Sequence, residues 1–161
     1  MKKTVILMHF ALLLFATSCG EAPKENSSAT PAEEPKSMVE DAPTYDPHRG
    51  EGKWTAENAG ITATLNSEKA TAGETATNVK CSSCHKMTDE KLVGPGWKGV
   101  TTRRTAEWIL NFITNPDPML DKDPEAQAML ELCLVRMPNQ NLTDEEALNI
   151  FEYMRKNDGV K

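Results

Sequence analysis

The stretch Lys80–Met87 reads KCSSCHKM and places two cysteines three positions apart, with a histidine directly after the second. Cys81, Cys84 and His85 therefore bring two thiols and one imidazole together within five residues. Such a cluster is typical of a redox-active dithiol, of part of a metal site, or of the attachment point of a covalent cofactor. The rest of the chain has to decide between these three interpretations.

The first two interpretations lack the residues that they need. A redox dithiol occurs at a strand-to-helix turn in a βαβ unit, and no segment of this chain alternates apolar and polar residues as a strand does. A structural zinc ion needs four protein ligands. The other candidate ligands in the mature chain are Cys133 and His48, and neither belongs to a second C-x-x-C or H-x-x-x-H pair.

The third interpretation explains the spacing. C-x-x-C-H is the attachment signature of c-type haem. Two thiolates add to the two vinyl groups of one porphyrin, and the adjacent histidine reaches the iron. Methionine is a common second axial ligand opposite histidine. His85 is the only histidine after residue 48, so a bis-histidine site would have to recruit His48.

Three further motifs follow in the order known from one family. After KCSSCHKM come LVGPGWKGV at residues 92–100, RMPNQNLTDEEA at 136–147 and IFEYM at 150–154. With these motifs, the chain from about residue 67 to 157 resembles a class I, single-haem cytochrome c. The resemblance implies an all-α fold wrapped around one covalent haem c.

The resemblance also implies roles for individual residues. Cys81 and Cys84 would hold the haem vinyl groups, His85 would be the proximal iron ligand and Met137 the distal one. Met119, in the segment DPMLDKD, is the second candidate for the distal position.

Two further residues are expected next to His85. The Pro95 carbonyl would accept a hydrogen bond from the other ring nitrogen of His85 and so fix the imidazole, and such outer contacts tune a metal. Trp97 would pack near the haem, and Tyr153 occupies an aromatic place common in the last helix.

One part of the family pattern is missing. The first helix usually carries a leucine and an aromatic residue shortly before the first cysteine, and these places hold Ala76 and Thr77. We therefore expect the contact between the first and last helices to be impaired, and we hypothesise that Trp54 or Ile61 fills the gap.

Apolar residues recur with helical period along most of the domain. Three start signals for helices occur: Thr105, the pair Asp123-Pro124, and Thr143 with Glu146 three residues later. Cys133 falls on an apolar face and is predicted to be a buried thiol. The predicted helices cover residues 69–80, 106–115, about 124–133 and about 144–157.

The N-terminus predicts export. Two lysines precede an apolar run at 5–16, which is shorter than the roughly 20 residues of a membrane anchor and has the length of a signal-peptide core. FATSCG resembles a lipoprotein processing site with Cys19 as the lipidated residue, although Ala16 stands where leucine is more usual. Cleavage after Ser18 without lipidation is the alternative.

Three regions follow from these patterns: a signal peptide at 1–18, a lipid-anchored disordered tether at 19–66, and the cytochrome c domain at 67–161. The tether is rich in proline, serine and glutamate, a composition that buries too little surface to fold. Trp54 and its neighbours suggest that part of it, residues 48–66, packs on the domain.

The net charge of −6 argues against nucleic acid as a partner.

The expected function is one-electron transfer by a monomer in the periplasm or cell envelope. Similar cytochromes serve a terminal oxidase or a denitrification reductase such as nitrous-oxide reductase, and we expect a partner of this kind. The alternative is a haem peroxidase or gas sensor with a labile methionine ligand; a third possibility is a structural module in a respiratory complex. Five bases near the haem-binding stretch could dock an acidic partner: Lys80, Lys86, Lys98, Arg103 and Arg104.

Overall fold

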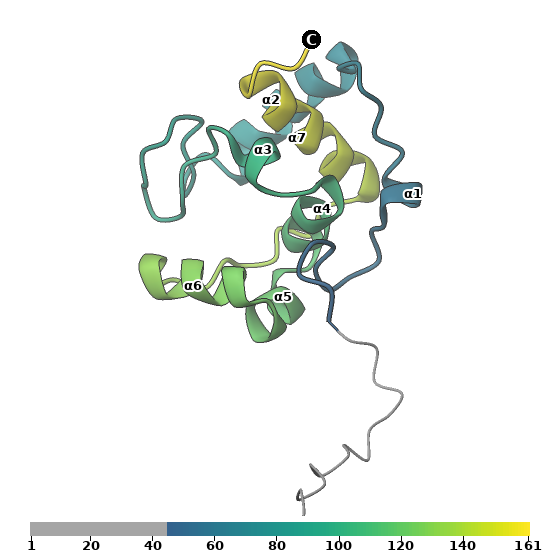
Figure 1. Ribbon diagram of the computed structural model, residues 1–161. Coiled ribbons are helices and arrows are strands. Elements are labelled where there is room, and N and C mark those ends of the chain that lie inside the picture. Colours follow the sequence, from purple (N-terminus) through teal and green to yellow (C-terminus); the bar gives the residue numbers. More distant parts are fainter. Residues whose placement is uncertain (1–44) are drawn as a thin grey trace, which may run out of the picture. The chain divides into compact units, whose positions relative to one another are not determined.

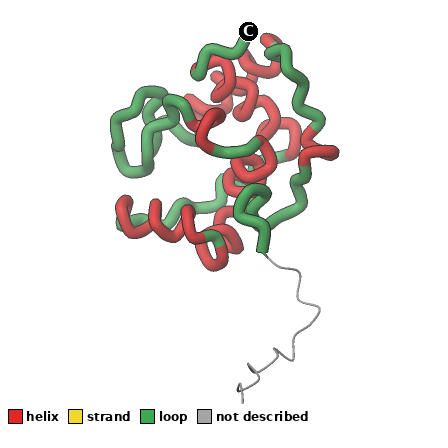
Figure 2. The backbone as a smooth tube through the Cα atoms, viewed as in Figure 1, coloured by secondary structure: helices red, strands yellow, loops and turns green. Residues whose placement is uncertain are grey.

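The computed structural model describes residues 45–161, and this part of the chain is helical with no strand (Figures 1 and 2). The predicted signal peptide, Cys19 and most of the predicted tether lie outside the described residues. The all-α prediction is confirmed. The helices are α1 (Ala56–Ala59), α2 (Ser67–Lys80), α3 (Val100–Arg103), α4 (Ala106–Thr114), α5 (Pro116–Lys122), α6 (Pro124–Cys133) and α7 (Asp144–Asn157).

Helices α2 and α7 form the most extensive helix pair, at the top of Figure 1. Gly73 lies at their crossing. A β-carbon at this position would overlap the backbone carbonyl of Asn149 and stand 2.9 Å from the backbone nitrogen of Ile150. Our expectation of an impaired contact was wrong, because a glycine that lets two backbones approach closely replaces the missing leucine and aromatic residue.

The buried face of α4 forms the centre of the core. Trp108, Ile109, Leu110 and Ile113 are at most 6% exposed, and a helix that packs on a core buries one such apolar face. The Thr105 side chain accepts from the backbone N–H of Trp108 and so caps the helix. This helix packs on α7, on α1 and on α5.

The segment before α2 lies against the core. Trp54 is 4% exposed, and its backbone N–H donates to the Asn111 side chain of α4 at 2.8 Å. Ile61 is partly buried against the core cluster. Farther along, the backbone N–H of Asn66 donates to Glu152 of α7. Trp54 is thus held by α4, not inserted at the α2–α7 crossing.

A short helix that we did not predict, α5, follows α4 directly. Asn115 ends α4 and also precedes α5, and Pro116 is the first residue of the new helix. A proline at this place costs no hydrogen bond, because the first N–H groups of a helix have no partner within it. The helix predicted at 106–115 ends at this pair, which also begins the next helix.

Helix α6 packs closely on α5 alone among the described helices. Asp123 caps it by accepting from the backbone N–H of Ala126 at 2.8 Å. In Figure 1, α5 and α6 lie apart from α3 and from the loop that follows α2. No helix among residues 45–161 is long and apolar enough to cross a membrane.

Candidate functional site

The cysteine cluster follows the end of α2 in a tight turn. The backbone N–H of Cys81 donates to the Thr77 carbonyl and continues the helical pattern, while the N–H groups of Cys84 and His85 both donate to the Cys81 carbonyl. Cys81 is 8% exposed and Cys84 is half-buried. The turn thus presents the second thiol and the imidazole just beyond the helix end.

The imidazole of His85 is held by the segment that contains Pro95. Nδ1 of His85 lies 2.9 Å from the Pro95 carbonyl oxygen, as we predicted. Because a carbonyl only accepts, Nδ1 carries the proton, and Nε2 keeps its lone pair for another partner. Backbone bonds from Gly94 to Cys84 and from Trp97 to Lys86 hold the two segments together.

Gly94 and Trp97 pack against the same ring. A β-carbon at Gly94 would stand 2.8 Å from Nδ1 of His85, so no side chain fits there without moving the imidazole. The Trp97 ring is 6% exposed, and its centroid lies 5.2 Å from that of His85. The position of the imidazole is therefore fixed from several sides.

Burial affects the ionisation of both ends of the cluster. It lowers the pKa of His85, although the bond to Pro95 acts in the opposite direction. A neutral imidazole is the form that binds a metal. Burial also raises the pKa of the Cys81 thiol to about 11, against the opposing influence of the Lys80 charge.

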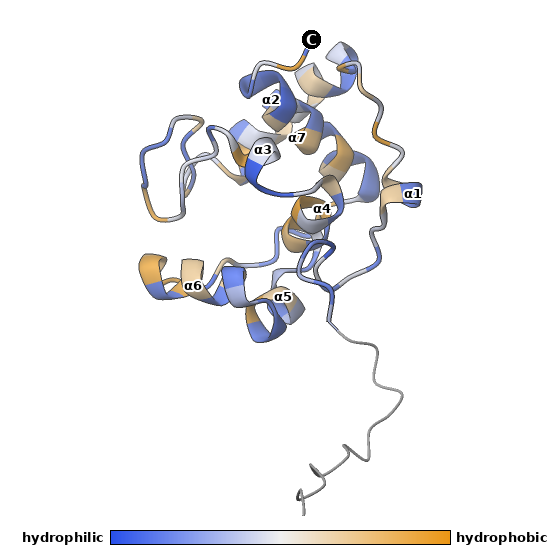
Figure 3. Ribbon diagram, in the orientation of Figure 1, coloured by the Kyte–Doolittle hydropathy of each residue, from blue (hydrophilic) through white to orange (hydrophobic). Residues whose placement is uncertain are grey.

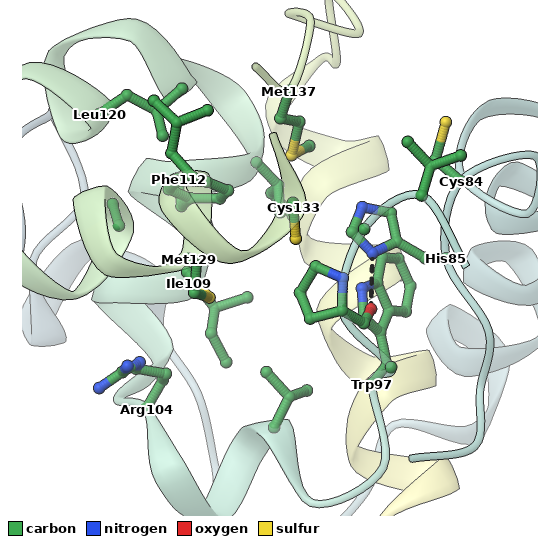
Figure 4. A pocket seen from close by; sticks show the side chains of 18 of the residues that line it. Cys84, His85, Trp97, Arg104, Ile109, Phe112, Leu120, Met129, Cys133 and Met137 are labelled. Atoms are coloured by element: carbon green, nitrogen blue, oxygen red, sulfur yellow. Dashed lines mark hydrogen bonds between the residues drawn. The ribbon is translucent and has the colours of Figure 1, made fainter. Parts of the chain in front are cut away.

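A large apolar pocket opens beside His85 (Figure 4). Its empty volume is about 1040 Å³, a value that includes solvent at the open side. His85 and Cys84 line one wall, and Met137 and Pro138 line another. The pocket therefore brings together five of the six residues that the resemblance placed at the haem: Cys84, His85, Pro95, Trp97 and Met137.

Helix α6 faces this pocket with an apolar face that includes Cys133, as we predicted for that residue. Ala126, Met129, Leu130 and Cys133 all line it. Cys133 is half-buried and forms no disulfide with the other described cysteines. It thus lies in the pocket wall instead of in a close-packed core.

The structure separates Met137 from Met119, whereas two other methionines share its pocket. Met119 is fully buried, and its Sδ accepts from the backbone N–H of Glu51 at 2.9 Å. It does not line the pocket. Met129 and Met154 line it from α6 and α7. His48 is exposed in the segment before α1 and is likewise absent from the pocket wall.

Charged side chains at the pocket wall are arginines. Arg104 pairs with Glu125 at 2.6 Å, and its guanidinium lies 4.9 Å from the Trp108 ring centroid. Arg136 pairs with two aspartates of α5. Arg103 also lines the pocket and donates to the Lys98 carbonyl.

The sequence predicted Asp123 as a helix cap, but not as a buried carboxylate behind the pocket. Asp123 is fully buried and accepts from the Tyr45 hydroxyl and, at 3.0 Å, from Trp108 Nε1. Since Trp108 lines the pocket, this network fixes one pocket wall. An aspartate at a cap is usually exposed, so the sequence held no signal for this second role.

The residues present fit a covalent haem c. One apolar pocket, which side chains leave unfilled, has all the groups that haem c needs in its wall or beside it. These groups are the thiol of Cys84, the buried thiol of Cys81, the His85 imidazole with a free Nε2 and the thioether of Met137. No group of three or more His, Cys, Asp or Glu side chains that could hold a bare metal ion occurs among residues 45–161.

Comparison with known proteins agrees with this fit. The family model described as cytochrome c matches residues 70–158. The structure is similar to cytochrome c from Rhodothermus marinus, with a TM-score of 0.62 and 28% identity over 70% of this chain and 92% of the other. The structure is also similar to an engineered form of the Rhodothermus marinus protein bound to a carbene intermediate. The TM-score is 0.60, and the identity is 28% over 70% of this chain and 98% of the other.

No match was found among curated proteins. The family model nevertheless covers more than half of the chain, including the cysteine cluster, the pocket and α7. The chain therefore belongs to the cytochrome c family, whose members carry electrons on covalently attached haem c.

Proposed function

We propose that this protein is an exported one-electron carrier with a single haem c, attached through Cys81 and Cys84 and ligated by His85 and Met137. The observation that carries the proposal is that His85 and Met137 line the same apolar pocket, while the bond from Nδ1 to Pro95 leaves Nε2 of His85 free. Met119, the second candidate, is engaged in the core.

The chain's own residues suit electron transfer without ligand exchange. Bound haem iron supplies a one-electron couple between its ferric and ferrous states. Pro95, Gly94 and Trp97 hold the imidazole in one orientation, which keeps reorganisation small. A histidine–methionine pair raises the reduction potential relative to two histidines, and the apolar wall keeps water away.

The N-terminal prediction gives this carrier a location. We propose that export removes residues 1–18 and that a lipid on Cys19 anchors the chain to a membrane of the cell envelope, with the domain in the periplasm. Tethering raises the effective concentration of the domain near membrane-bound redox proteins. Fractionation of cells that express the wild type or Cys19→Ala tests this. Release of only the variant into the soluble fraction is expected, and equal release of both would contradict it.

Mass spectrometry and redox titration test the haem proposal itself. The mature chain, produced with a haem-attachment system, should carry the mass of one haem, and Cys81→Ala with Cys84→Ala should carry none. Met137→Ala should lower the reduction potential and open an iron position to external ligands. Met129→Ala is the matched control in the same pocket. A change in ligation for Met129→Ala, with none for Met137→Ala, would assign the distal ligand elsewhere.

A further inference from the structure

Two carboxylates are buried among residues 45–161, and only one of them has a cation as its partner. Glu152 is 4% exposed and pairs with Arg155, which is itself buried. Asp123 is fully buried, yet it forms no ion pair in the described part of the chain. Buried charges in proteins are usually paired with an opposite charge, so the isolated carboxylate of Asp123 needs an explanation.

The cations of the segments next to Asp123 are engaged with other carboxylates. Lys122, the preceding residue, pairs with Glu51 at 3.2 Å. Arg104 reaches α6 but pairs there with Glu125 at 2.6 Å. No contact with a cation therefore cancels the negative charge of Asp123.

Three neutral donors hold the Asp123 carboxylate instead. Its Oδ1 accepts from the backbone N–H of Ala126 at 2.8 Å, and its Oδ2 accepts from Trp108 Nε1 at 3.0 Å and from the Tyr45 hydroxyl. An ionised carboxylate accepts at both oxygens and donates nothing, which fits these three partners. Burial and then the bond to Asp123 raise the pKa of Tyr45, so Tyr45 remains a donor at neutral pH.

Asp123 lies directly behind the wall of the haem pocket. Two of its three donors, Trp108 and Ala126, line that pocket, whereas Asp123 itself does not. In Figure 3, hydrophilic residues, drawn in blue, mark the junction of α5 and α6, where Asp123 connects the two helices. The carboxylate is thus separated from the pocket by residues to which it is bonded.

A negative charge at this place acts on a redox centre in the pocket. In the oxidised state a haem site carries one more positive charge than in the reduced state, and a nearby carboxylate stabilises that charge. Trp108 and Ala126 are 4% and 0% exposed, so water does not lie between the two charges. The effective dielectric constant inside a protein is about 20, compared with about 80 in water, and the attraction is correspondingly stronger.

We propose that the buried charge of Asp123 lowers the reduction potential of the haem site through the wall formed by Trp108 and Ala126. Tyr45 is then a positioning residue, because its hydroxyl holds the carboxylate without cancelling its charge. The inference rests on the proposed function as an electron carrier. Asp123 offsets part of the rise in potential that ligation by histidine and methionine causes.

Redox titration of the holoprotein at about pH 7 tests this role. Asp123→Asn removes the charge and keeps the shape of the side chain. The equilibrium with a redox mediator should move about tenfold toward the reduced protein, which is a rise of about 59 mV for one electron. Asp123→Ser is a second neutral variant, since serine also caps helices, and it should shift the potential in the same direction.

Two controls separate the charge from the structure around it. Tyr45→Phe removes a hydrogen bond and keeps the charge, so it should not raise the potential. Glu131→Gln removes an exposed carboxylate of α6 that forms no ion pair among residues 45–161, and its equilibrium should stay within about twofold of the wild type. The shift of Asp123→Asn should persist at about 0.5 M salt, because salt screens buried charges little.

The direction of the shift distinguishes a charge effect from a loosened pocket. A pocket that admits water stabilises the oxidised site and lowers the potential, whereas loss of a negative charge raises it. An unchanged or lower potential in the neutral variants of Asp123 would overturn the proposal. A rise in Tyr45→Phe as large as that in Asp123→Asn would assign the effect to the hydrogen bonds and overturn it as well.

Mass and optical spectra separate this inference from the proposed function. If the wild type holds no covalent haem, the proposed function fails. If every variant keeps the covalent haem and the wild-type spectrum but the potentials of Asp123→Asn and Glu131→Gln do not differ, only the role of Asp123 fails.

Discussion

Gly73 of α2 lies directly against the backbone carbonyl of Asn149 in α7, so closely that the glycine has no room for a β-carbon. The two helices that frame the domain therefore meet backbone to backbone. Their contact holds the end of α2, and with it the cysteine cluster, in a fixed place relative to α7.

The first prediction concerns this crossing. Gly73→Ala would gain about 1 kcal/mol of helix propensity on an open helix face. Here it must push α2 and α7 apart, and overpacking costs about 1–3 kcal/mol. We expect a net loss in the free energy of unfolding, measured by denaturant titration of the holoprotein. Thr75→Ala, on the exposed side of α2, is the control. An unchanged or raised stability for Gly73→Ala would contradict the close crossing.

A second prediction concerns the imidazole. Gly94→Ala places a methyl group against the His85 ring and should shift the reduction potential and the near-infrared or magnetic spectrum of the iron site, while the mass still shows covalent haem. Leu92→Ala, two residues earlier, 46% exposed and outside the pocket wall, is the control. Equal spectra for Gly94→Ala and the wild type would mean that the ring is not confined by this segment.

A third prediction tests the buried ion pair of α7. Arg155 pairs with Glu152 and donates to the carbonyls of Thr62 and Ala63. Arg155→Met leaves a buried carboxylate without its partner and should cost about 3–5 kcal/mol of unfolding free energy. Lys53→Met removes an exposed pair with Asp144 and should cost less than about 1 kcal/mol. Similar losses for both variants would show that the Arg155 pair is not effectively buried.

A fourth prediction concerns the network at Asp123. Tyr45→Phe removes a hydrogen bond to a buried carboxylate, and a bond to a charged group contributes about 1.5–3 kcal/mol. Burial and then the bond to Asp123 raise the pKa of Tyr45 above its usual value. The stabilisation is therefore fully present below the unfolded pKa of about 10 and is lost as pH rises through the folded pKa.

The corresponding measurement is the unfolding free energy of the wild type and Tyr45→Phe between pH 7 and 11. The difference between them should be constant up to about pH 9.5 and should narrow at higher pH, because the unfolded wild type loses the proton of Tyr45 at a lower pH than the folded protein does. Tyr153→Phe controls for tyrosine ionisation elsewhere. A difference that grows above pH 10 would contradict the assignment.

The sequence predicted the parts of the site that depend on local spacing. The C-x-x-C-H cluster, the caps at Thr105, Asp123 and Thr143, and the bond from His85 to Pro95 all follow from short motifs. Each needs only residues close in sequence or a motif that the family shares.

Features that depend on distant backbone contacts could not be predicted. Glycine is unfavourable inside a helix by propensity, yet the approach of α7 makes Gly73 necessary. Asn115-Pro116 carries the signals for both a stop and a start, and only packing decides between them.

The optical spectrum of the mature domain, oxidised, reduced and reduced under carbon monoxide, tests the central claim most directly. With His85 and Met137 both on the iron, the reduced protein should show a low-spin c-type spectrum that carbon monoxide leaves unchanged. A high-spin spectrum that shifts with carbon monoxide would contradict the electron-carrier account and favour a peroxidase or gas sensor.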